Sequence, residues 1–149
     1  MFVYPVRLVQ NTSASIYAIA CRDLPFVHAT GDTADKTLQN ASEAVILAIS
    51  VVMGERRMVP TGSKVQRGEH LVSIPVLVAM KVVLHNTMIE KGMRKADLGR
   101  SLNLKNPQIE RLLDLHYPSK VELVEKAIHQ LGRAIRLTAV EVYAPNRSA

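Results

Sequence analysis

The apolar residues of this 149-residue chain change their spacing along the sequence. Near the N-terminus they occupy every second position, in Phe2, Tyr4, Val6 and Leu8, which is the spacing of a strand with one buried face. After Gly31 they recur every three or four positions, which is the spacing of an amphipathic helix. Strands followed by helices predict an α+β fold.

Three strands are expected at the N-terminus. Residues 2–9 form the first, and Ile16–Cys21, which is rich in strand-forming residues, forms the second. The turn-forming residues 11–14 join these two strands as a hairpin. Pro25 ends the hairpin because it cannot donate to a strand ladder, and Phe26–Thr30 is predicted as a short third strand.

A long helix and a fourth strand complete the predicted N-terminal unit. Asp32 or Thr33 is expected to be the N-cap of an amphipathic helix of about five turns. The polar segment 55–70 is predicted as a loop, and Leu71–Ile74 as a further strand. These elements place an α+β domain, a small sheet with one main helix on a face, at residues 1–74.

The remaining residues, 75–149, are predicted as a second, mainly helical domain. Pro75 suits the start of a helix, because its missing N–H group would have no partner there, and Gly92 ends that helix. Asn106 and Ser119 are the expected N-caps of two later helices. The predicted segments are three shorter helices and a closing strand, at Arg94–Leu102, Pro107–Leu115, Lys120–Leu131 and Ala134–Tyr143.

The helices predicted at 94–102 and 107–115 have the spacing of a helix-turn-helix pair. Gly99 is a small residue where the second helix would pass over the first, and Asn103 tolerates the positive φ that the turn needs. Ile109 is placed to anchor the second helix in the core. Helical hairpins with a glycine also occur in purely structural roles, and this alternative stays open on the pattern alone.

Basic charge is concentrated in the second half of the chain. Residues 1–74 hold seven Lys and Arg against six Asp and Glu, a net charge of +1, whereas residues 75–149 hold twelve against seven, a net charge of +5. A polyanion such as double-stranded DNA would therefore bind the second half. The alternative is a well-solvated basic surface without a partner.

A DNA-reading helix would enter the major groove with its N-terminus first. Asn and Gln side chains pair with adenine, and Arg pairs with guanine. The residues expected to face the DNA are therefore Lys105, Asn106, Gln108 and Arg111. Ser119 and Lys120 stand at the start of the next helix, where a phosphate contact is favoured.

The predicted C-terminal strand, 134–143, has no hairpin mate nearby in the sequence. Its apolar residues lie on both faces, with Ile135 and Leu137 on one and Val140 and Val142 on the other. An unpaired strand of this kind invites pairing with the same strand of a second copy. We therefore expect a homodimer or a higher even oligomer, and a palindromic operator.

The sequence offers no catalytic motif. It has no Gly-rich phosphate loop, nucleophile elbow or His-Glu-x-x-His pair, and its single cysteine, Cys21, excludes an intramolecular disulfide and a four-cysteine zinc site. We expect no catalytic residue, metal site or cofactor. The carboxylates of Asp23, Asp32, Asp35 and Glu43 leave one enzymatic alternative open, a metal-dependent ribonuclease.

No membrane segment is expected either. The longest apolar runs, 44–53 and 71–80, are shorter than the roughly 18 residues that a spanning helix needs. The N-terminus lacks the basic and apolar regions of a signal peptide. A cytoplasmic protein fits this pattern and the single cysteine.

A series of short motifs along residues 3–142 resembles the HicB family of antitoxins, in its longer branch with a C-terminal helix-turn-helix domain. No single motif is specific, but their order is. The N-terminal ones are Tyr4-Pro5-Val6, Asp23-Leu24-Pro25, Thr30-Gly31-Asp32-Thr33, Asn40-Ala41 and Glu43-Ala44. The later ones are Ile74-Pro75, Lys81, Asn86, Leu98, Arg100, Gln108-Ile109-Glu110-Arg111-Leu112, Leu115-His116 and Ser119-Lys120.

The resemblance implies a fold and two binding roles. The N-terminal domain would resemble a partial, non-catalytic ribonuclease H fold and would neutralise a small RNA-cleaving toxin of the HicA type. The C-terminal domain would repress the operon that encodes both proteins. A stand-alone or phage-type transcription regulator of the same architecture, without a toxin partner, remains the alternative.

Overall fold

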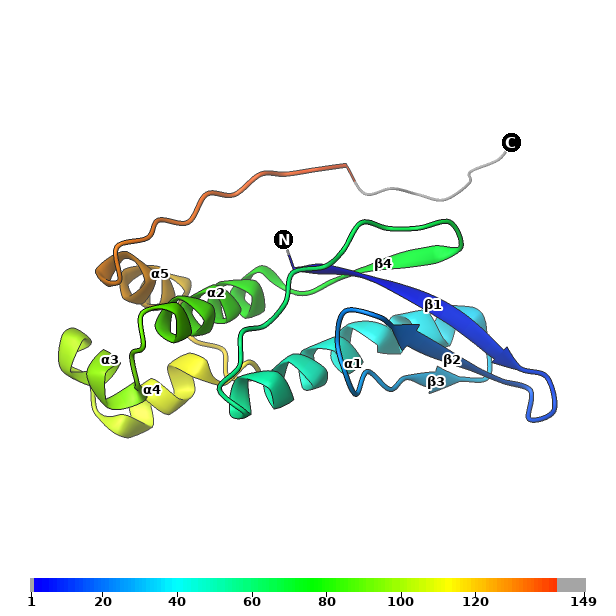
Figure 1. The fold of residues 1–149 in the computed structure, drawn as a ribbon, viewed down its shortest axis with the longest axis horizontal. Helices are drawn as coiled ribbons and strands as arrows, with labels where there is room; N and C mark the ends of the chain where they lie inside the picture. Colours follow the sequence, from blue (N-terminus) through cyan, green and yellow to red (C-terminus); the bar gives the residue numbers. More distant parts are fainter. Residues whose placement is uncertain (1, 142–149) are drawn as a thin grey trace.

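The computed structural model describes residues 2–141, which form a four-stranded antiparallel sheet and five α-helices (Figure 1). The α+β class is therefore confirmed. In chain order the elements are β1 (Val3–Asn11), β2 (Ile16–Cys21), β3 (Thr30–Gly31), α1 (Ala34–Gly54), β4 (Glu69–Ser73), α2 (Val76–Glu90), α3 (Lys95–Leu102), α4 (Asn106–Leu113) and α5 (Val121–Gln130).

The strands lie in the order β3-β2-β1-β4, so β1 is central and pairs on both sides. The predicted β1–β2 hairpin is confirmed, with Val6 opposite Cys21. Tyr4 and Val6 are fully buried in the core that α1 shares with the sheet, which explains the alternation seen in the sequence. The helices α3 to α5 lie at the other end of the molecule (Figure 1).

The third strand is shorter than predicted and starts later. The prediction of a strand over Phe26–Thr30 is wrong, because β3 consists of Thr30 and Gly31 alone and pairs with Tyr17 and Ala18. Phe26 has a φ of +62° and is 64 % exposed. A positive φ interrupts the extended backbone at Phe26, so an extended segment cannot begin there, and the first backbone hydrogen bond to β2 is the one of 3.2 Å that the Ala29 carbonyl accepts from Ile19.

Helix α1 covers one face of the sheet. Thr33 is its N-cap, as predicted, and its hydroxyl accepts a hydrogen bond of 3.2 Å from the N–H group of Lys36. The uninterrupted apolar runs of the sequence are each too short to span a membrane, but the whole of α1 is long and apolar enough to do so by length and composition alone. Core helices of soluble proteins pass the same test, and the buried residues of α1, among them Val45 and Ile49, belong to the core beneath the sheet.

The segment between α1 and β4, residues 55–68, is held in place by hydrogen bonds from the guanidinium of Arg22, which directly follows β2. This side chain makes hydrogen bonds of 2.9 and 3.1 Å to the two carboxylate oxygens of Glu69 and one of 2.6 Å to the carbonyl of Lys64. The bond from Arg22 and a bond from the Gln66 N–H group hold the pKa of Glu69 down, at about 2. The segment is thereby fixed against β2 and β4.

Two close approaches complete this attachment. The Tyr4 hydroxyl donates a 2.7 Å hydrogen bond to the carbonyl of Pro60, and burial raises the pKa of Tyr4. A side chain at Gly62 would place its Cβ atom 1.6 Å from the carbonyl oxygen of Val3, so only glycine fits there. The loop predicted at 55–70 is thus ordered, and β4 begins within it at Glu69.

Helix α2 belongs to both hydrophobic cores. Val78 and Val82 join the core between α1 and the sheet, whereas Met80 and Leu84 join the core formed with α3, α4 and α5. Its buried surface is consequently wider than the single apolar stripe of an amphipathic helix, whereas Val76 in its first turn is 56 % exposed. The sheet and the helical end are packed together through this helix.

Two helix starts differ from the prediction. Lys105, not Asn106, is the N-cap of α4, because the side-chain oxygen of Gln108 accepts the Lys105 N–H group at 2.9 Å. Lys120, not Ser119, is the N-cap of α5. The Ser119 hydroxyl instead donates to the carbonyl of Arg111 at 3.3 Å.

The predicted closing strand is wrong for the single chain. Residues 134–141 follow α5 without forming a strand, and they run from the helical end back past α2 toward the end of the molecule that holds the sheet (Figure 1). Ile135 is half-buried against the helical core, but Leu137 and Val140 are each 74 % exposed. A strand needs a ladder partner, and the described part of one chain supplies none for this segment. Val142 lies outside the described residues.

Candidate nucleic-acid interface

Helices α3 and α4 meet at a contact that only glycine allows. A Cβ atom on Gly99 would lie 2.9 Å from the Leu104 carbonyl oxygen and 3.6 Å from Cγ1 of Ile109. The Leu104 N–H group donates to the Gly99 carbonyl at 2.9 Å. Asn103 has a φ of +53°, as predicted, and Ile109 is fully buried, as predicted. The three residues thus set how α4 lies on α3.

The polar face of α4 is open to solvent. Its apolar residues Ile109 and Leu112 are fully buried, which leaves the opposite side of the helix exposed. The exposed residues include every predicted DNA-facing position of this segment, namely Lys105, Asn106, Gln108 and Arg111. Lys120 is also exposed, and Ser119 is half-buried.

Three of the predicted cations are available to an anion. Within residues 2–141, Lys105, Arg111 and Lys120 form no ion pair. Two predicted polar side chains are partly engaged. The oxygen of Gln108 accepts the Lys105 N–H group, so its NH₂ group is the part left for a base, and the Ser119 hydroxyl donates to Arg111.

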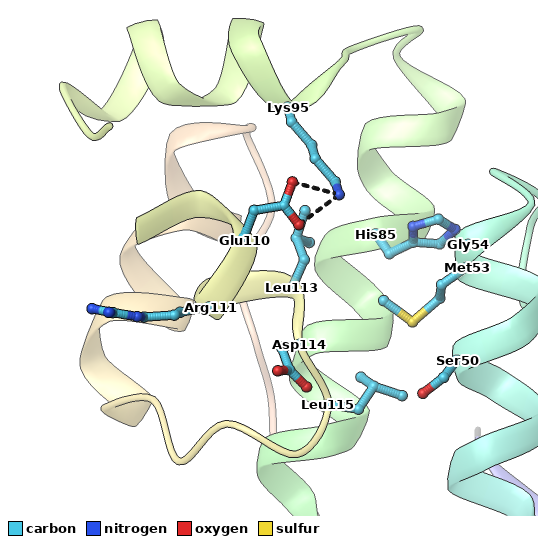
Figure 2. A pocket seen from close by; sticks show the side chains of 10 residues that line it. All are labelled: Ser50, Met53, Gly54, His85, Lys95, Glu110, Arg111, Leu113, Asp114 and Leu115. Carbon is cyan, nitrogen blue, oxygen red and sulfur yellow. Dashed lines mark hydrogen bonds and ion pairs between the residues drawn. The ribbon is translucent and has the colours of Figure 1, made fainter. Parts of the chain in front are cut away.

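The one carboxylate on the exposed side of α4 is neutralised. Glu110 accepts two hydrogen bonds of 2.9 Å from the ammonium of Lys95, at the start of α3 (Figure 2). A negative charge on this face would repel a phosphate backbone. The pairing therefore offsets the one feature of α4 that argues against an anionic ligand.

Sequence reasoning named Lys81 only as part of a family motif and assigned it no role, whereas in the structure it is a fully buried residue of α2. Its ammonium donates hydrogen bonds of 3.0, 2.6 and 2.8 Å to the carbonyls of Arg111, Asp114 and Tyr117. The Arg111 and Asp114 carbonyls lie at the C-terminal end of α4, where a cation is favoured by the helix dipole. Burial lowers the pKa of Lys81, and the Asp114 carboxylate opposes this. A single lysine inside the apolar run 76–84 was the available signal.

Tyr117 was also missed. Its ring centroid lies 5.6 Å from Cζ of Arg111 and 5.8 Å from Nζ of Lys81. Both distances are within the range of a cation–π contact. The ring therefore contacts both an exposed guanidinium and a buried ammonium.

A cavity of about 380 Å³ separates α4 from the end of α1 (Figure 2). Met53 and His85 line it on one side and Glu110 on the other, whereas Arg111 extends away from α1 (Figure 2). The ring nitrogen Nε2 of His85 lies 2.8 Å from the carbonyl of Arg57, and burial lowers the pKa of this histidine. The cavity thus adjoins the candidate interface. Of the exposed cations of that interface, Arg111 lines the cavity, whereas Lys105 and Lys120 do not.

Three of the four acidic residues considered for metal catalysis are engaged by neighbouring side chains. Asp23 accepts hydrogen bonds from the N–H group and hydroxyl of Ser63, and Asp32 pairs with Lys36. Glu43 contacts Nε2 of His116 at 2.6 Å. In residues 2–141 the structure brings together no group of three or more His, Cys, Asp or Glu side chains that could hold a metal ion.

Comparison with known proteins gives a consistent result. The family described as HicB-like antitoxin of bacterial toxin–antitoxin systems matches residues 3–83. "Antitoxin HicB" of Pseudomonas fluorescens is 40 % identical over 93 % of this chain and 94 % of its own length. "Antitoxin HicB 2" of Photorhabdus laumondii is 31 % identical over 92 % of this chain and 96 % of its own length. "Antitoxin HicB" of Escherichia coli is 26 % identical over 92 % of this chain and 99 % of its own length.

Proposed function

This chain belongs to the family of HicB-like antitoxins of bacterial toxin–antitoxin systems, and we propose that it neutralises a small RNA-cleaving toxin of the HicA type and represses its own operon. Family membership carries the first half of this proposal. The exposed, unpaired cations of α4 carry the second half, because phosphate neutralisation supplies most of the affinity of a DNA-binding protein. Both activities belong to the cytoplasm, where the operon and its transcripts are.

The sheet and α1 are the toxin-binding part in this proposal, corresponding to residues 1–74. The sheet then serves as a partial ribonuclease H-like scaffold that binds a protein and does not cut RNA. The engagement of Asp23, Asp32 and Glu43 by neighbouring side chains supports a binding role over a metal-dependent ribonuclease. Relatives named as antitoxins support the same choice.

Residues 75–149 are the DNA-binding and dimerisation part. Helices α3 and α4 act as a helix-turn-helix pair that places Lys105, Asn106, Gln108 and Arg111 against double-stranded operator DNA. Ser119 and Lys120 lie beside the C-terminal end of α4, since Ser119 bonds to Arg111, and Lys120 contacts a phosphate. The exposed segment beyond α5 pairs two copies into a homodimer or a higher even oligomer.

Co-expression with the short neighbouring gene tests the first half of the proposal. We expect the neighbouring protein to stop growth when expressed alone, and growth to return when this chain is present. The two proteins should then co-purify. An adjoining gene product that neither arrests growth nor binds this chain would instead support the stand-alone regulator.

Gel-shift titration tests the second half. The chain should bind a duplex that covers the region upstream of its own gene more tightly than a shuffled duplex of equal length and composition. Arg111→Ala is the separating variant, because it should weaken operator binding by about 1–3 kcal/mol and leave co-purification with the toxin unchanged. Equal affinity of the wild-type chain for both duplexes contradicts a repressor. Magnesium-dependent degradation of RNA by the purified chain would favour the ribonuclease.

A further inference from the structure

The aromatic ring of Tyr117 supports the guanidinium of Arg111, the residue of α4 best placed to read a guanine. We propose that Tyr117 is a positioning residue, which holds Arg111 in the direction that DNA binding needs. The inference rests on the proposed operator-binding role of α4. It assigns a task to a residue that lies outside the helix pair, in the turn between α4 and α5.

The contact geometry suits such a task. Cζ of Arg111 lies 5.6 Å from the ring centroid, and a guanidinium that rests on a ring by its flat face keeps its N–H edges free. Those edges are the donors that pair with O6 and N7 of guanine. An exposed arginine on a surface helix has many rotamers, so holding one of them lowers the entropy lost when DNA binds.

The backbone of Tyr117 is held by the buried Lys81. The lysine ammonium bonds to the carbonyl of Tyr117 at 2.8 Å and to the carbonyl of Arg111 at 3.0 Å. One cation from α2 therefore fixes the backbone at both ends of the Tyr117–Arg111 contact. Because Lys81 is fully buried, the backbone from which the 40 % exposed Tyr117 side chain projects is anchored to the core of the molecule.

The binding test compares Tyr117→Leu with Tyr117→Phe on the upstream duplex and on the shuffled duplex. Loss of the ring should weaken binding to the upstream duplex by about two- to fivefold, which corresponds to one exposed cation–π contact. Tyr117→Phe keeps the ring and should bind like the wild-type chain. In the Arg111→Ala background, Tyr117→Leu should have no further effect, since no guanidinium is left to position.

A measurement without DNA tests the same contact. Proton–nitrogen NMR of the arginine Nε–H groups should show an upfield-shifted resonance that disappears in Arg111→Lys. The shift should be retained in Tyr117→Phe and lost in Tyr117→Leu, because it arises from the ring current.

The outcomes separate this inference from the proposed function. An unshifted Arg111 resonance in the wild-type chain overturns the inference, as does an equal effect of Tyr117→Leu with and without Arg111. Wild-type protein that binds the upstream and shuffled duplexes equally overturns the repressor function, and the role of Tyr117 in DNA binding with it. Tighter binding of the upstream duplex, together with an effect of Tyr117→Leu that vanishes in the Arg111→Ala background, supports both the repressor function and the role of Tyr117.

Discussion

The side-chain amide of Asn86 pairs with both backbone groups of Val59, at 2.9 Å from Val59 N to Oδ1 and at 2.9 Å from Nδ2 to Val59 O. Asn86 thus bonds to the chain as a neighbouring strand would, and both residues are buried. The pairing joins the segment after α1 to α2. His85 makes a second connection of this kind, to the carbonyl of Arg57.

We predict that Asn86→Ala destabilises the chain, because the buried N–H and C=O groups of Val59 lose their partners. An unsatisfied buried group costs about 1–3 kcal/mol, and the loss should appear as a lower midpoint of urea unfolding. Asn40→Ala is the matched control, since Asn40 is exposed and makes a single bond of 3.3 Å to Thr30. A cost at Asn86 no larger than at Asn40 would show that the pairing adds nothing to stability.

A second prediction concerns the crossing of α3 and α4. Gly99→Ala brings a Cβ atom to 2.9 Å from the Leu104 carbonyl, which must shift and carry α4 with it. We expect a loss of about 1–3 kcal/mol in the free energy of unfolding, together with weaker operator binding. Gly54→Ala, in α1, meets no atom within 4 Å and should be neutral or stabilising by up to about 1 kcal/mol. Thermal unfolding of the two variants measures the two changes in stability, and a gel shift with the upstream duplex measures the change in operator binding.

The spacing of apolar residues sufficed to predict the hairpin, the long helix and the order of the helical segments. The roles of Gly99, Asn103 and Ile109 were also predictable, because a small side chain, a positive φ and a buried anchor are each demands on one residue type. Local chemistry of this sort is visible in a sequence without knowing the fold.

Features that depend on distant parts of the chain were not predictable. Lys81 is buried because carbonyls thirty or more residues away meet its ammonium, and no local pattern specifies them. Ser119 was assigned as an N-cap from its type, yet its hydroxyl bonds to Arg111 of the preceding helix. The strand predicted after α5 failed for a related reason, since alternation indicates strand propensity but does not supply a partner.

The ion pair between Arg22 and Glu69 predicts a component of acid sensitivity. The hydrogen bonds from Arg22 lower the pKa of Glu69 from 4.5 to about 2 in the folded chain, so its carboxylate stabilises the fold most fully at any pH above about 4.5. This contribution is lost as the pH falls from about 4.5 through 2. The difference in melting temperature between the wild-type chain and Glu69→Gln should therefore shrink between pH 6 and about pH 3.

Arg22→Met provides the control for this prediction. It removes the cation whose hydrogen bonds are the main cause of the lowered pKa of Glu69, so it should reduce the same pH-dependent difference. Melting curves from circular dichroism across this range are sufficient. A difference between wild type and Glu69→Gln that is constant with pH would mean that Glu69 is not held in its ionised form by the fold.

The final prediction concerns assembly through the segment after α5. Leu137 and Val140 are each 74 % exposed, which is unusual for two large apolar residues so close together, and their backbone has no ladder partner within the described chain. Pairing with the same segment of a second copy would cover both. It would also place two α4 helices about a twofold axis, as two half-sites about 34–36 Å apart on one face of DNA require.

Truncation tests this assembly without disturbing the helical core. A chain that ends at Arg136 keeps Ile135, which packs against that core, and removes one acidic and one basic residue, Glu141 and Arg147, so its net charge is unchanged. We expect light scattering to show a monomer, with operator binding much weaker than that of the full chain because one half-site contact remains. A chain that ends at Tyr143 retains the whole predicted segment and should stay dimeric. If the shorter chain is still a dimer that binds its operator fully, the interface lies elsewhere.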